Sequence, residues 1–302
     1  MDRSLIAKVK KHWGKQGEWQ VGRGLHWTEH AAVQERINRK VSGDPRKNPF
    51  VFLIDFLQQR GVSLPVERCL TLGCGAGRLE RGLHNHGFCR QHDAYDIADK
   101  SIEQARKAAK DENLSHIHYD VVDLNQIALP ADTYDVVFGV MSVHHFTNLE
   151  HIFDEVRRSL KPGGLFFLNE FVGPTKFQWT DRQLDVMNAL LKILPERYRM
   201  GKKRNLKTQI VRPTVAEMDA IDPSEAIRSG EILDVLSSRF RIVQKRDYGG
   251  TLLHLLLEGI AFNFDQARPE DVRILGMLFE VEDALLETGE LPSDFTVVVA
   301  EP

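Results

Sequence analysis

Three alternating glycines constrain the fold of this chain more than any other feature. Gly73, Gly75 and Gly77 follow a mostly apolar run, Val66–Leu72, and a helical pattern begins at Leu79. This order predicts a strand, a tight loop and a helix, because glycine permits positive φ and close approach of backbone to a ligand. The helix would direct its N-terminal N–H groups and the positive end of its dipole at the loop. We therefore expect a cofactor cradle, although the G-x-G-x-G spacing alone also fits a glycine turn without a ligand.

Short apolar runs alternate with amphipathic stretches after about residue 61. We expect strands at 66–72, 91–96, 117–122, 134–140, 165–171, 240–246 and 294–300. Strands that alternate with helices predict an α/β fold with a Rossmann-like, doubly wound sheet. We expect an N-terminal helical segment at residues 1–60 and one domain at 61–302. Helical insertions at about 173–229 and 251–290 could form a cap with the N-terminal helices.

Composition excludes several classes of protein. The 302 residues are 42% hydrophobic and carry a net charge of −3, whereas a nucleic-acid-binding surface usually shows a basic excess. The three cysteines, Cys69, Cys74 and Cys89, form no disulfide framework and indicate a reducing cytoplasm. The N-terminus lacks the apolar core of a signal peptide. The most apolar run, residues 252–262, is too short to span a bilayer. We expect a cytoplasmic protein without a membrane span.

Polar residues follow several predicted strands. Asp96 ends the second strand, Asp123 follows the third and is itself followed by Leu124, and the pair His144-His145 follows the fourth. In an open parallel sheet, ligands bind beyond the carboxyl ends of the strands, where the strand order reverses. An acid at Asp96 could accept hydrogen bonds from both hydroxyls of a ribose, and Asp123 could accept an exocyclic amine. The sequence therefore predicts a nucleoside-containing cofactor.

Five motifs in order resemble those of class I S-adenosylmethionine-dependent methyltransferases. They are Leu70-Thr71-Leu72-Gly73-Cys74-Gly75-Ala76-Gly77, Tyr95-Asp96-Ile97, Asp123-Leu124, Val143-His144-His145-Phe146 and Leu160-Lys161-Pro162-Gly163-Gly164. The resemblance covers about residues 65–172, and the late strands resemble the family's sixth strand and antiparallel seventh strand. It implies a seven-stranded sheet and S-adenosylmethionine as cofactor.

The resemblance also implies roles for the matching residues. The loop residues Gly73, Cys74, Gly75 and Gly77 would meet the methionyl part of the cofactor. Asp96 would bind the ribose and Asp123 the adenine amine, with Ile97 and Leu124 packed on the adenine.

A further set of motifs is similar to a bacterial subgroup associated with cell-surface glycan synthesis. These motifs are Glu170-Phe171-Val172-Gly173-Pro174, Phe177-Gln178-Trp179-Thr180-Asp181, Arg212-Pro213-Thr214 and Tyr248-Gly249-Gly250-Thr251-Leu252-Leu253-His254. This resemblance implies a saccharide acceptor.

Methyl transfer is an in-line displacement, and a hydroxyl acceptor profits from a general base that takes its proton. The candidates are His145, His144 and Glu170, and we favour His145, since histidine is easily poised near neutral pH. For His144 there are two alternatives to the role of base. It either packs in the protein or caps the next helix, or it contacts the substrate. Glu170 either binds an acceptor hydroxyl or caps the segment that follows it.

Four further residues are candidates for substrate recognition. They are His26, Trp27, Trp179 and Arg212, which combine aromatic, imidazole and cationic groups. Packing is the alternative for both tryptophans. No cluster shows the spacing of metal ligands, so we expect no metal, with a magnesium site of Asp and Glu left open.

These features favour O-methylation of a small-molecule or saccharide acceptor. A nicotinamide-dependent Rossmann oxidoreductase is the alternative enzyme, because an acid after the second strand fits it equally well. A non-catalytic cofactor-binding or assembly protein is the third hypothesis. The sequence specifies neither the acceptor nor the oligomeric state.

Overall fold

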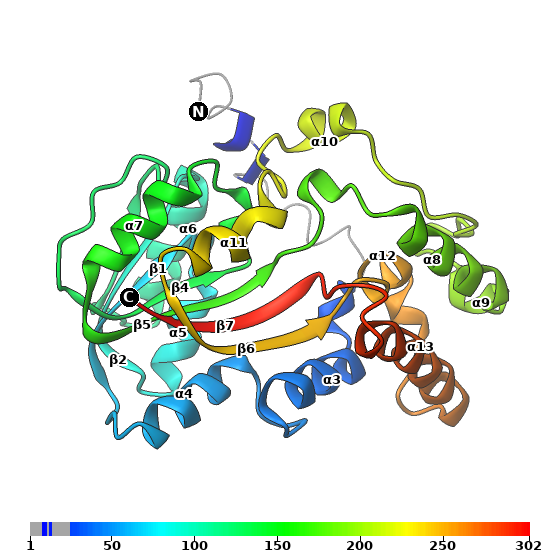
Figure 1. Ribbon diagram of the computed structural model, residues 1–302, viewed down its shortest axis with the longest axis horizontal. Coiled ribbons are helices and arrows are strands. Elements are labelled where there is room, and N and C mark those ends of the chain that lie inside the picture. Colours follow the sequence, from blue (N-terminus) through cyan, green and yellow to red (C-terminus); the bar gives the residue numbers. More distant parts are fainter. Residues whose placement is uncertain (1–7, 11, 14–24) are drawn as a thin grey trace.

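The computed structural model describes residues 8–10, 12–13 and 25–302, and the rest of the predicted N-terminal helical segment lies outside these residues. In the described chain, seven strands form one sheet in the order β3-β2-β1-β4-β5-β7-β6 (Figure 1). The strands are β1 (Val66–Leu72), β2 (Cys89–Asp96), β3 (Ile117–Val121), β4 (Tyr134–Val140), β5 (Leu160–Phe171), β6 (Arg241–Gly249) and β7 (Phe295–Glu301). The predicted doubly wound, Rossmann-like sheet is confirmed.

The last strand is antiparallel to its neighbours, as predicted. β1 to β5 pair in parallel, whereas β7 is inserted between β5 and β6 and runs antiparallel to both. Asn169 of β5 faces Val297 of β7, and Arg246 of β6 faces the same valine from the other side. β7 is therefore an internal strand, and its residues through Ala300 are buried.

Alternate residues of β7 enter two cores on opposite faces of the sheet. Val297 and Val299 pack in the core that contains α3 (Ala31–Ser42), α4 (Pro49–Gln59) and α5 (Arg78–Asn85). Val298 and Ala300 pack in the core that contains α7 (Leu149–Ser159) and α11 (Ile232–Ser237). Figure 1 shows these two helical layers on either side of the sheet. The period of two in a strand produces this division.

Helices α3 and α4 of the predicted N-terminal segment pack in the core of the sheet. Asn48 caps α4, since its side-chain oxygen accepts the N–H groups of Phe50 and Val51 at 2.9 and 3.0 Å. Leu53 and Leu57 of α4 are buried in the same core as the inner strands. On the outer strands, α6 (Asp99–Asp111) packs against β2 and β3.

β5 begins five residues earlier than predicted. Tyr134 of β4 pairs with Leu160, and Val136 pairs with Leu165, so the intervening Lys-Pro-Gly-Gly segment forms a bulge within the strand. Gly163 has φ of +81°, a backbone conformation that favours glycine. The turn motif therefore interrupts the strand rather than preceding it.

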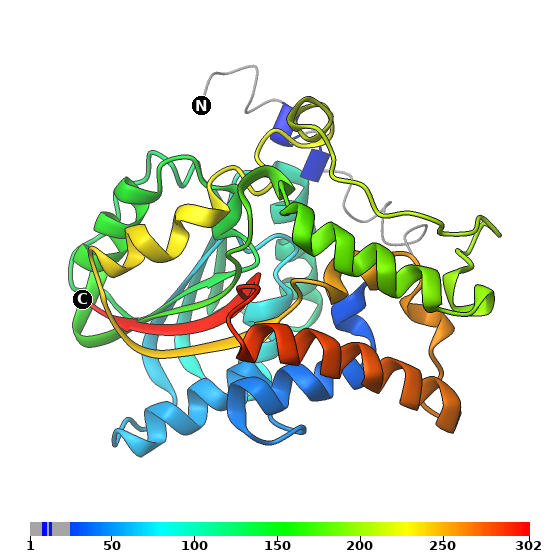
Figure 2. The ribbon, with the colours of Figure 1, turned by 45° about the vertical axis from the view of Figure 1, so that its right-hand side comes forward.

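The two predicted insertions contribute helices at the end of the sheet where β5 ends and β7 begins (Figure 2). The first holds α8 (Asp181–Ile193), α9 (Glu196–Arg199) and α10 (Val215–Ile221), and the second holds α12 (Leu253–Leu257) and α13 (Pro269–Glu287). Short 3₁₀ helices η1 (Trp27–Glu29), η2 (Val143–His145), η3 (Thr175–Phe177), η4 (Ser229–Glu231) and η5 (Ala261–Asn263) lie between longer elements.

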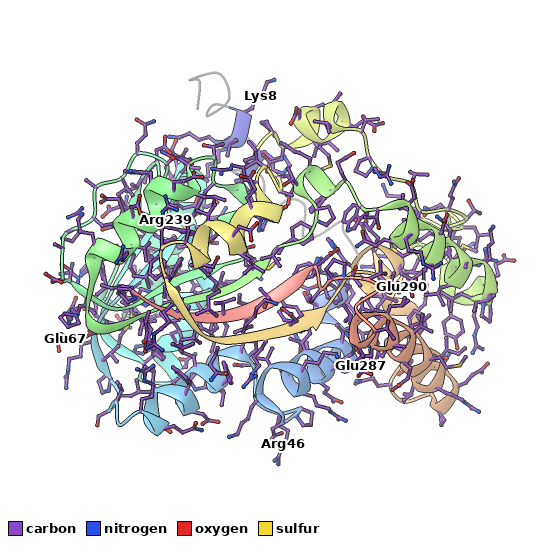
Figure 3. The ribbon with its side chains drawn as sticks, viewed as in Figure 1. Lys8, Arg46, Glu67, Arg239, Glu287 and Glu290 are labelled. Atoms are coloured by element: carbon purple, nitrogen blue, oxygen red, sulfur yellow. The ribbon has the colours of Figure 1, made fainter. Side chains whose placement is uncertain are left out.

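Aromatic side chains join the cap to the sheet. The rings of Trp27, Phe171 and His254 surround Phe295, with centroids 5.2 to 5.4 Å from its ring. Charged side chains of both signs, including Arg46 and Glu67, project at the periphery of the molecule (Figure 3). In the described part of the chain, no helix has the length and apolar character needed to cross a membrane.

Candidate functional site

A cavity lies beyond the carboxyl ends of β1 to β4, where the strand order reverses between β1 and β4. The residues predicted from the sequence that line it are Gly73, Gly75, Asp96, Ile97, Asp123, Leu124 and His145. These residues come from four separate loops. The sheet therefore brings most of the predicted cofactor residues and one predicted catalytic residue to one cavity.

The outer glycines of the loop are required by packing inside the protein. Gly73 has φ of +73°, and a Cβ on it would lie 2.5 Å from the Cβ of Ser142. Gly77 has φ of +72°, and a Cβ there would lie 2.5 Å from the hydroxyl oxygen of Tyr119. Neither position accepts a larger residue without displacing these neighbours. Approach of a ligand is thus not the only reason for the glycines.

Two predicted cofactor residues lie behind the loop. Gly77 begins α5 as its N-cap and does not line the cavity. Cys74 packs with Ala94 and Tyr119 in the core beneath α6, and burial raises the pKa of its thiol. Both residues support the shape of the loop from within the protein.

Asp96 fastens the loop to the end of β2. Its Oδ2 accepts the N–H of Gly75, and its Oδ1 accepts the N–H of Ala98, both at 2.8 Å. Burial raises the pKa of this carboxyl group, and the backbone N–H groups act in the opposite direction. Each carboxylate oxygen has two lone pairs, so acceptor capacity remains for a ligand hydroxyl in the cavity.

The loops after β3 and β4 hold one another. Asp123 Oδ1 accepts the N–H of Asn125 at 3.0 Å. The Asn125 side-chain oxygen then accepts the N–H groups of Thr147 and Asn148 at 2.8 and 3.0 Å. Asp123 therefore belongs to a network that fixes the adjacent wall of the cavity.

Glu170 supports the loop after β4 from below. Its Oε2 accepts the N–H groups of Ser142 and Val143 at 2.8 and 2.7 Å, and its Oε1 contacts Nδ1 of His144. The side chain is fully buried and does not line the cavity. We expected it either to bind an acceptor hydroxyl or to cap the segment that follows it, whereas its carboxylate caps the start of η2, which precedes it in sequence.

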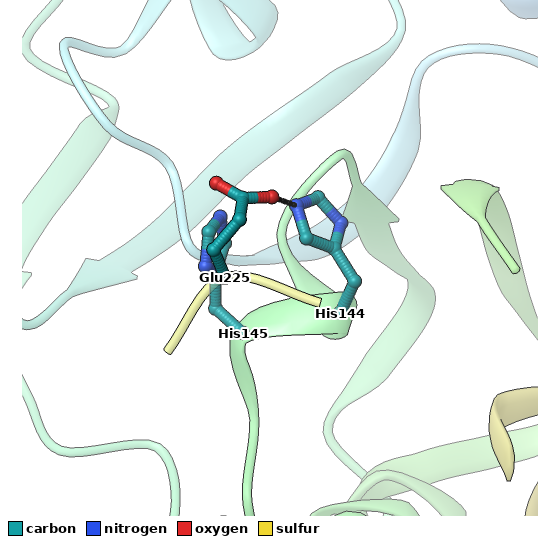
Figure 4. A group of neighbouring side chains, drawn as sticks. All are labelled: His144, His145 and Glu225. Carbon is teal, nitrogen blue, oxygen red and sulfur yellow. Dashed lines mark ion pairs between the residues drawn. The ribbon is translucent and has the colours of Figure 1, made fainter. Parts of the chain in front are cut away.

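His144 lies between two carboxylates. Its Nδ1 faces Glu170, and its Nε2 is 3.5 Å from Oε1 of Glu225, which comes from the first insertion (Figure 4). Burial alone lowers the pKa of His144, but the two carboxylates overcome it and raise the pKa to about 10. Burial likewise raises the pKa of Glu225, yet the two histidines lower it to about 2. At neutral pH this is a buried imidazolium with a carboxylate on each side.

Ligand atoms of His144, His145 and Glu225 lie within 4.8 Å of one another, which is the arrangement of a candidate metal site (Figure 4). An imidazolium has protons on both nitrogens and no lone pair for a metal. In its protonated form His144 therefore offers no ligand atom, and the group would bind a metal only after losing this proton.

His145 faces the cavity. Its Nδ1 is 3.2 Å from the hydroxyl oxygen of Ser224 and 3.8 Å from Oδ2 of Asp222. Burial and the neighbouring His144 lower the pKa of His145. The imidazole is therefore neutral near pH 7, with one nitrogen available as a base.

The sequence did not reveal the remaining wall of the cavity. Val9 and Trp13 line it, and the Trp13 ring contacts the His145 ring edge-on with centroids 4.9 Å apart. Met141 also lines it with φ of +50°, an uncommon backbone conformation for a non-glycine residue. The aromatic side chain of Trp13 was the available signal for a wall residue. However, Trp13 is far in sequence from every motif, so the sequence did not show that it lies at this cavity.

The four predicted substrate residues outside the β4 loop lie elsewhere. His26 and Trp27 line a second cavity, which they share with Lys202 of the first insertion and His254 of the second. The buried indole N–H of Trp179 donates to Asp294 at 2.9 Å, and Arg212 donates to the carbonyl oxygen of Trp179 at 2.6 Å. Trp179 thus bonds to the residue that precedes β7, Arg212 bonds to Trp179, and neither residue lines either cavity.

A family described as methyltransferase domain matches residues 70–168, about a third of the chain. The matched segment contains the glycine loop, Asp96, Asp123 and both adjacent histidines. It therefore covers the loops that build most of the cavity.

Two curated relatives match a similar region. The S-adenosyl-L-methionine-dependent Diels-Alderase of Talaromyces variabilis is 34% identical over 113 residues, which are 36% of this chain and 38% of that protein. The 24-methylenesterol C-methyltransferase 3 of Arabidopsis thaliana is 25% identical over 168 residues, which are 55% of this chain and 44% of that protein. The chain spans less than half the length of these relatives.

A solved structure matches over almost the whole length. It is geranyl diphosphate C-methyltransferase from Streptomyces coelicolor A3(2), in complex with Mg²⁺, geranyl-S-thiolodiphosphate and S-adenosyl-L-homocysteine. The TM-score is 0.56 at 13% identity, and the match covers 99% of this chain and 98% of that one. At this identity the likeness concerns the fold, including the insertions that extend the sheet domain.

Proposed function

We propose that this chain is a class I S-adenosylmethionine-dependent methyltransferase that transfers a methyl group to an oxygen of a small-molecule acceptor. One observation carries the proposal. The residues that the family uses for the cofactor line a cavity whose other wall holds His145, a neutral imidazole. The cavity thus combines a cofactor cradle and a base.

The residues present fit the cofactor. Asp96 retains acceptor capacity for the ribose hydroxyls, and Gly73 and Gly75 leave room along the loop for the methionyl part. Ile97 and Leu124 offer apolar surface for the adenine. When bound, the cofactor would supply an electrophilic methyl group for the acceptor oxygen.

His145 takes the proton that the acceptor hydroxyl loses. The O–H bond breaks, its electron pair forms the new bond to the methyl carbon, and the proton moves to the imidazole nitrogen. Trp13 and Phe146 give the same cavity an apolar lining beside His145. Glu170 holds the backbone that leads to His145 through the N–H groups of Ser142 and Val143, and neither Glu170 nor His144 lines the cavity.

A labelled-methyl assay tests the proposal. S-adenosylmethionine with a ¹⁴C-methyl group is incubated with the protein and with phenols, saccharides, sterols and linear isoprenoids as separate acceptor panels. We expect the label to appear in an ether product. Its rate of formation should depend on His145, so that H145Q lowers this rate about 100-fold or more. The exposed His86 provides the control variant H86Q, which should keep full activity. Cofactor binding without any labelled product would instead support a non-catalytic protein.

C-methylation of an isoprenoid is a second candidate. Two observations favour it: a curated relative is named as a sterol C-methyltransferase, and Val9, Trp13 and Phe146 give the cavity an apolar wall. In that reaction His145 would take a proton from carbon after methylation of a double bond. ¹³C NMR of the product separates the candidates, because a methyl carbon on oxygen and one on carbon have distinct chemical shifts.

A further inference from the structure

Asp222 and Ser224 lie beside His145, although about 80 residues separate them in sequence. Both belong to the turn after α10, and this turn docks on the β4 loop through a hydrogen bond from the N–H of Ile227 to the carbonyl oxygen of His144 at 3.0 Å. Asp222 and Ser224 are each 1% exposed. Their polar atoms therefore bond within the protein, and their geometry decides which atom donates each proton.

In the described part of the chain, the carboxylate of Asp222 is the acceptor in each of its hydrogen bonds. Its Oδ1 receives the N–H and the hydroxyl of Ser224 at 2.9 and 2.7 Å. Its Oδ2 receives the indole N–H of Trp13 at 3.0 Å. A carboxylate has no proton to donate, so the single hydroxyl proton of Ser224 lies between Ser224 and Asp222.

This arrangement determines the proton on His145. The Ser224 oxygen is 3.2 Å from Nδ1 of His145 and, with its own proton directed at Asp222, can only accept. We propose that Asp222 and Ser224 are positioning residues that fix the tautomer of His145, with the proton on Nδ1 and the lone pair on Nε2. The catalytic role of this tautomer rests on the proposed function, because the base of the methyl transfer must present a lone pair to the acceptor.

The charged groups around His145 are compatible with this tautomer. The His144 ring is 4.1 Å away between centroids, and its positive charge opposes a second proton on His145. Glu225 has an oxygen within 4.8 Å of a His145 nitrogen, but it pairs with Nε2 of His144 at 3.5 Å. Glu170 faces His144. His12 lies beyond Asp222, at 3.9 Å from its Oδ2.

Ser224 and Asp222 also stabilise His145 after it has taken the acceptor proton. Once Nε2 has taken the acceptor proton, the imidazolium keeps Nδ1–H directed at Ser224 and at Asp222, 3.8 Å away. A carboxylate at this distance favours the positive charge that forms. No other proton moves in the step.

¹⁵N NMR of the protein labelled at histidine tests the assignment without cofactor or acceptor. The signals of His145 are identified by their loss in H145Q. At neutral pH we expect a pyrrole-type signal for Nδ1 and a pyridine-type signal for Nε2. A pyridine-type Nδ1 in the wild-type protein would overturn the inference.

Two variants test the roles of the positioning residues. S224A removes the acceptor, and D222A removes the carboxylate that holds the hydroxyl proton of Ser224, so that this proton can turn toward His145. We expect a mixture of the two tautomers of His145 in each variant. D219N, at an exposed aspartate of α10, should keep the wild-type signals.

Binding of S-adenosylhomocysteine to each variant, measured by calorimetry, reports that the fold is intact. If D222A and S224A bind it and retain the wild-type tautomer, Asp222 and Ser224 do not position His145. If the wild-type protein has the expected tautomer but H145Q transfers methyl groups at the wild-type rate, the proposed base is wrong and the tautomer assignment stands. The two failures are therefore distinguishable.

Discussion

The carboxylate of Asp96 accepts the backbone N–H of Gly75 at 2.8 Å, so the acid after β2 fixes the middle of the glycine loop. The same carboxylate holds the N–H of Ala98 and lines the cavity. The glycine loop and the acid at the end of β2, which the sequence analysis identified as separate motifs, therefore form one structural unit. Cofactor affinity and loop stability should change together when Asp96 is replaced.

We predict that D96A lowers the affinity for S-adenosylhomocysteine about 10- to 100-fold, the size expected when hydrogen bonds to a charged group are lost. The free energy of unfolding should fall by about 1–3 kcal/mol, because two backbone N–H groups lose their acceptor. Calorimetry and urea denaturation measure the two effects. D120A, at an exposed aspartate that pairs with Arg106, is the control and should change neither. Wild-type affinity in D96A would contradict the assignment of Asp96.

Removal of the charge on Glu170 should destabilise the protein strongly. Glu170 accepts hydrogen bonds from two backbone N–H groups of the β4 loop and contacts the His144 imidazolium. Breaking a buried charged pair from one side costs about 3–5 kcal/mol, and we predict a loss of this size in E170Q by urea denaturation. E67Q, at an exposed residue paired with Arg90, should stay within about 0.5 kcal/mol of the wild type. A similar small effect in E170Q would show that the pair is dispensable.

The elevated pKa of His144 makes stability depend on pH above neutrality. The folded protein holds this proton up to a pKa of about 10, whereas the unfolded chain releases it near 6.5. The stabilisation is therefore present below pH 6.5 and is lost as pH rises toward 10. Burial places the pKa of His145 below its usual value, so His145 titrates outside this window.

We predict that the free energy of unfolding falls more steeply between pH 7 and 9.5 in the wild type than in H144Q, by up to about 1.4 kcal/mol per pH unit. Urea denaturation at several pH values gives both slopes. Only the slopes are compared, because H144Q also changes the absolute stability. Parallel curves would rule out a buried imidazolium at this position.

Trp13 should contribute to cofactor retention. Its ring lines the cavity and contacts His145, and its indole N–H donates to Asp222 at 3.0 Å. We predict that W13A weakens binding of S-adenosylhomocysteine several-fold, since the cavity loses one wall and admits water. W13F keeps an aromatic ring and should bind more tightly than W13A, as measured by calorimetry. Equal affinities for W13A and the wild type would show that the N-terminal residues do not close the site.

The sequence predicted the sheet and the cofactor wall of the cavity because both depend on local patterns. Apolar runs located the strands, and Gly73, Asp96 and Asp123 each occupy a fixed place after one of them. The start of β5 shows the largest displacement, because the glycine turn is accommodated as a bulge against Tyr134. Parallel topology then brings the carboxyl ends of these strands together without further information.

The acceptor wall could not be predicted in the same way. Trp13 and Asp222 are 209 residues apart, and neither belongs to a periodic pattern that specifies a partner. Their contact depends on how an insertion docks on the β4 loop, which side-chain packing decides. For the same reason Trp27 and His26, although adjacent to a helix as expected, line a different cavity.

Calorimetric titration of the wild-type protein with S-adenosylhomocysteine, and in parallel with NADH, tests the central claim most directly. The account predicts one binding site for S-adenosylhomocysteine per chain, since one cavity joins the glycine loop, Asp96, Asp123 and His145, and no heat of binding for NADH. Binding of NADH without binding of S-adenosylhomocysteine, or binding of neither, would contradict it.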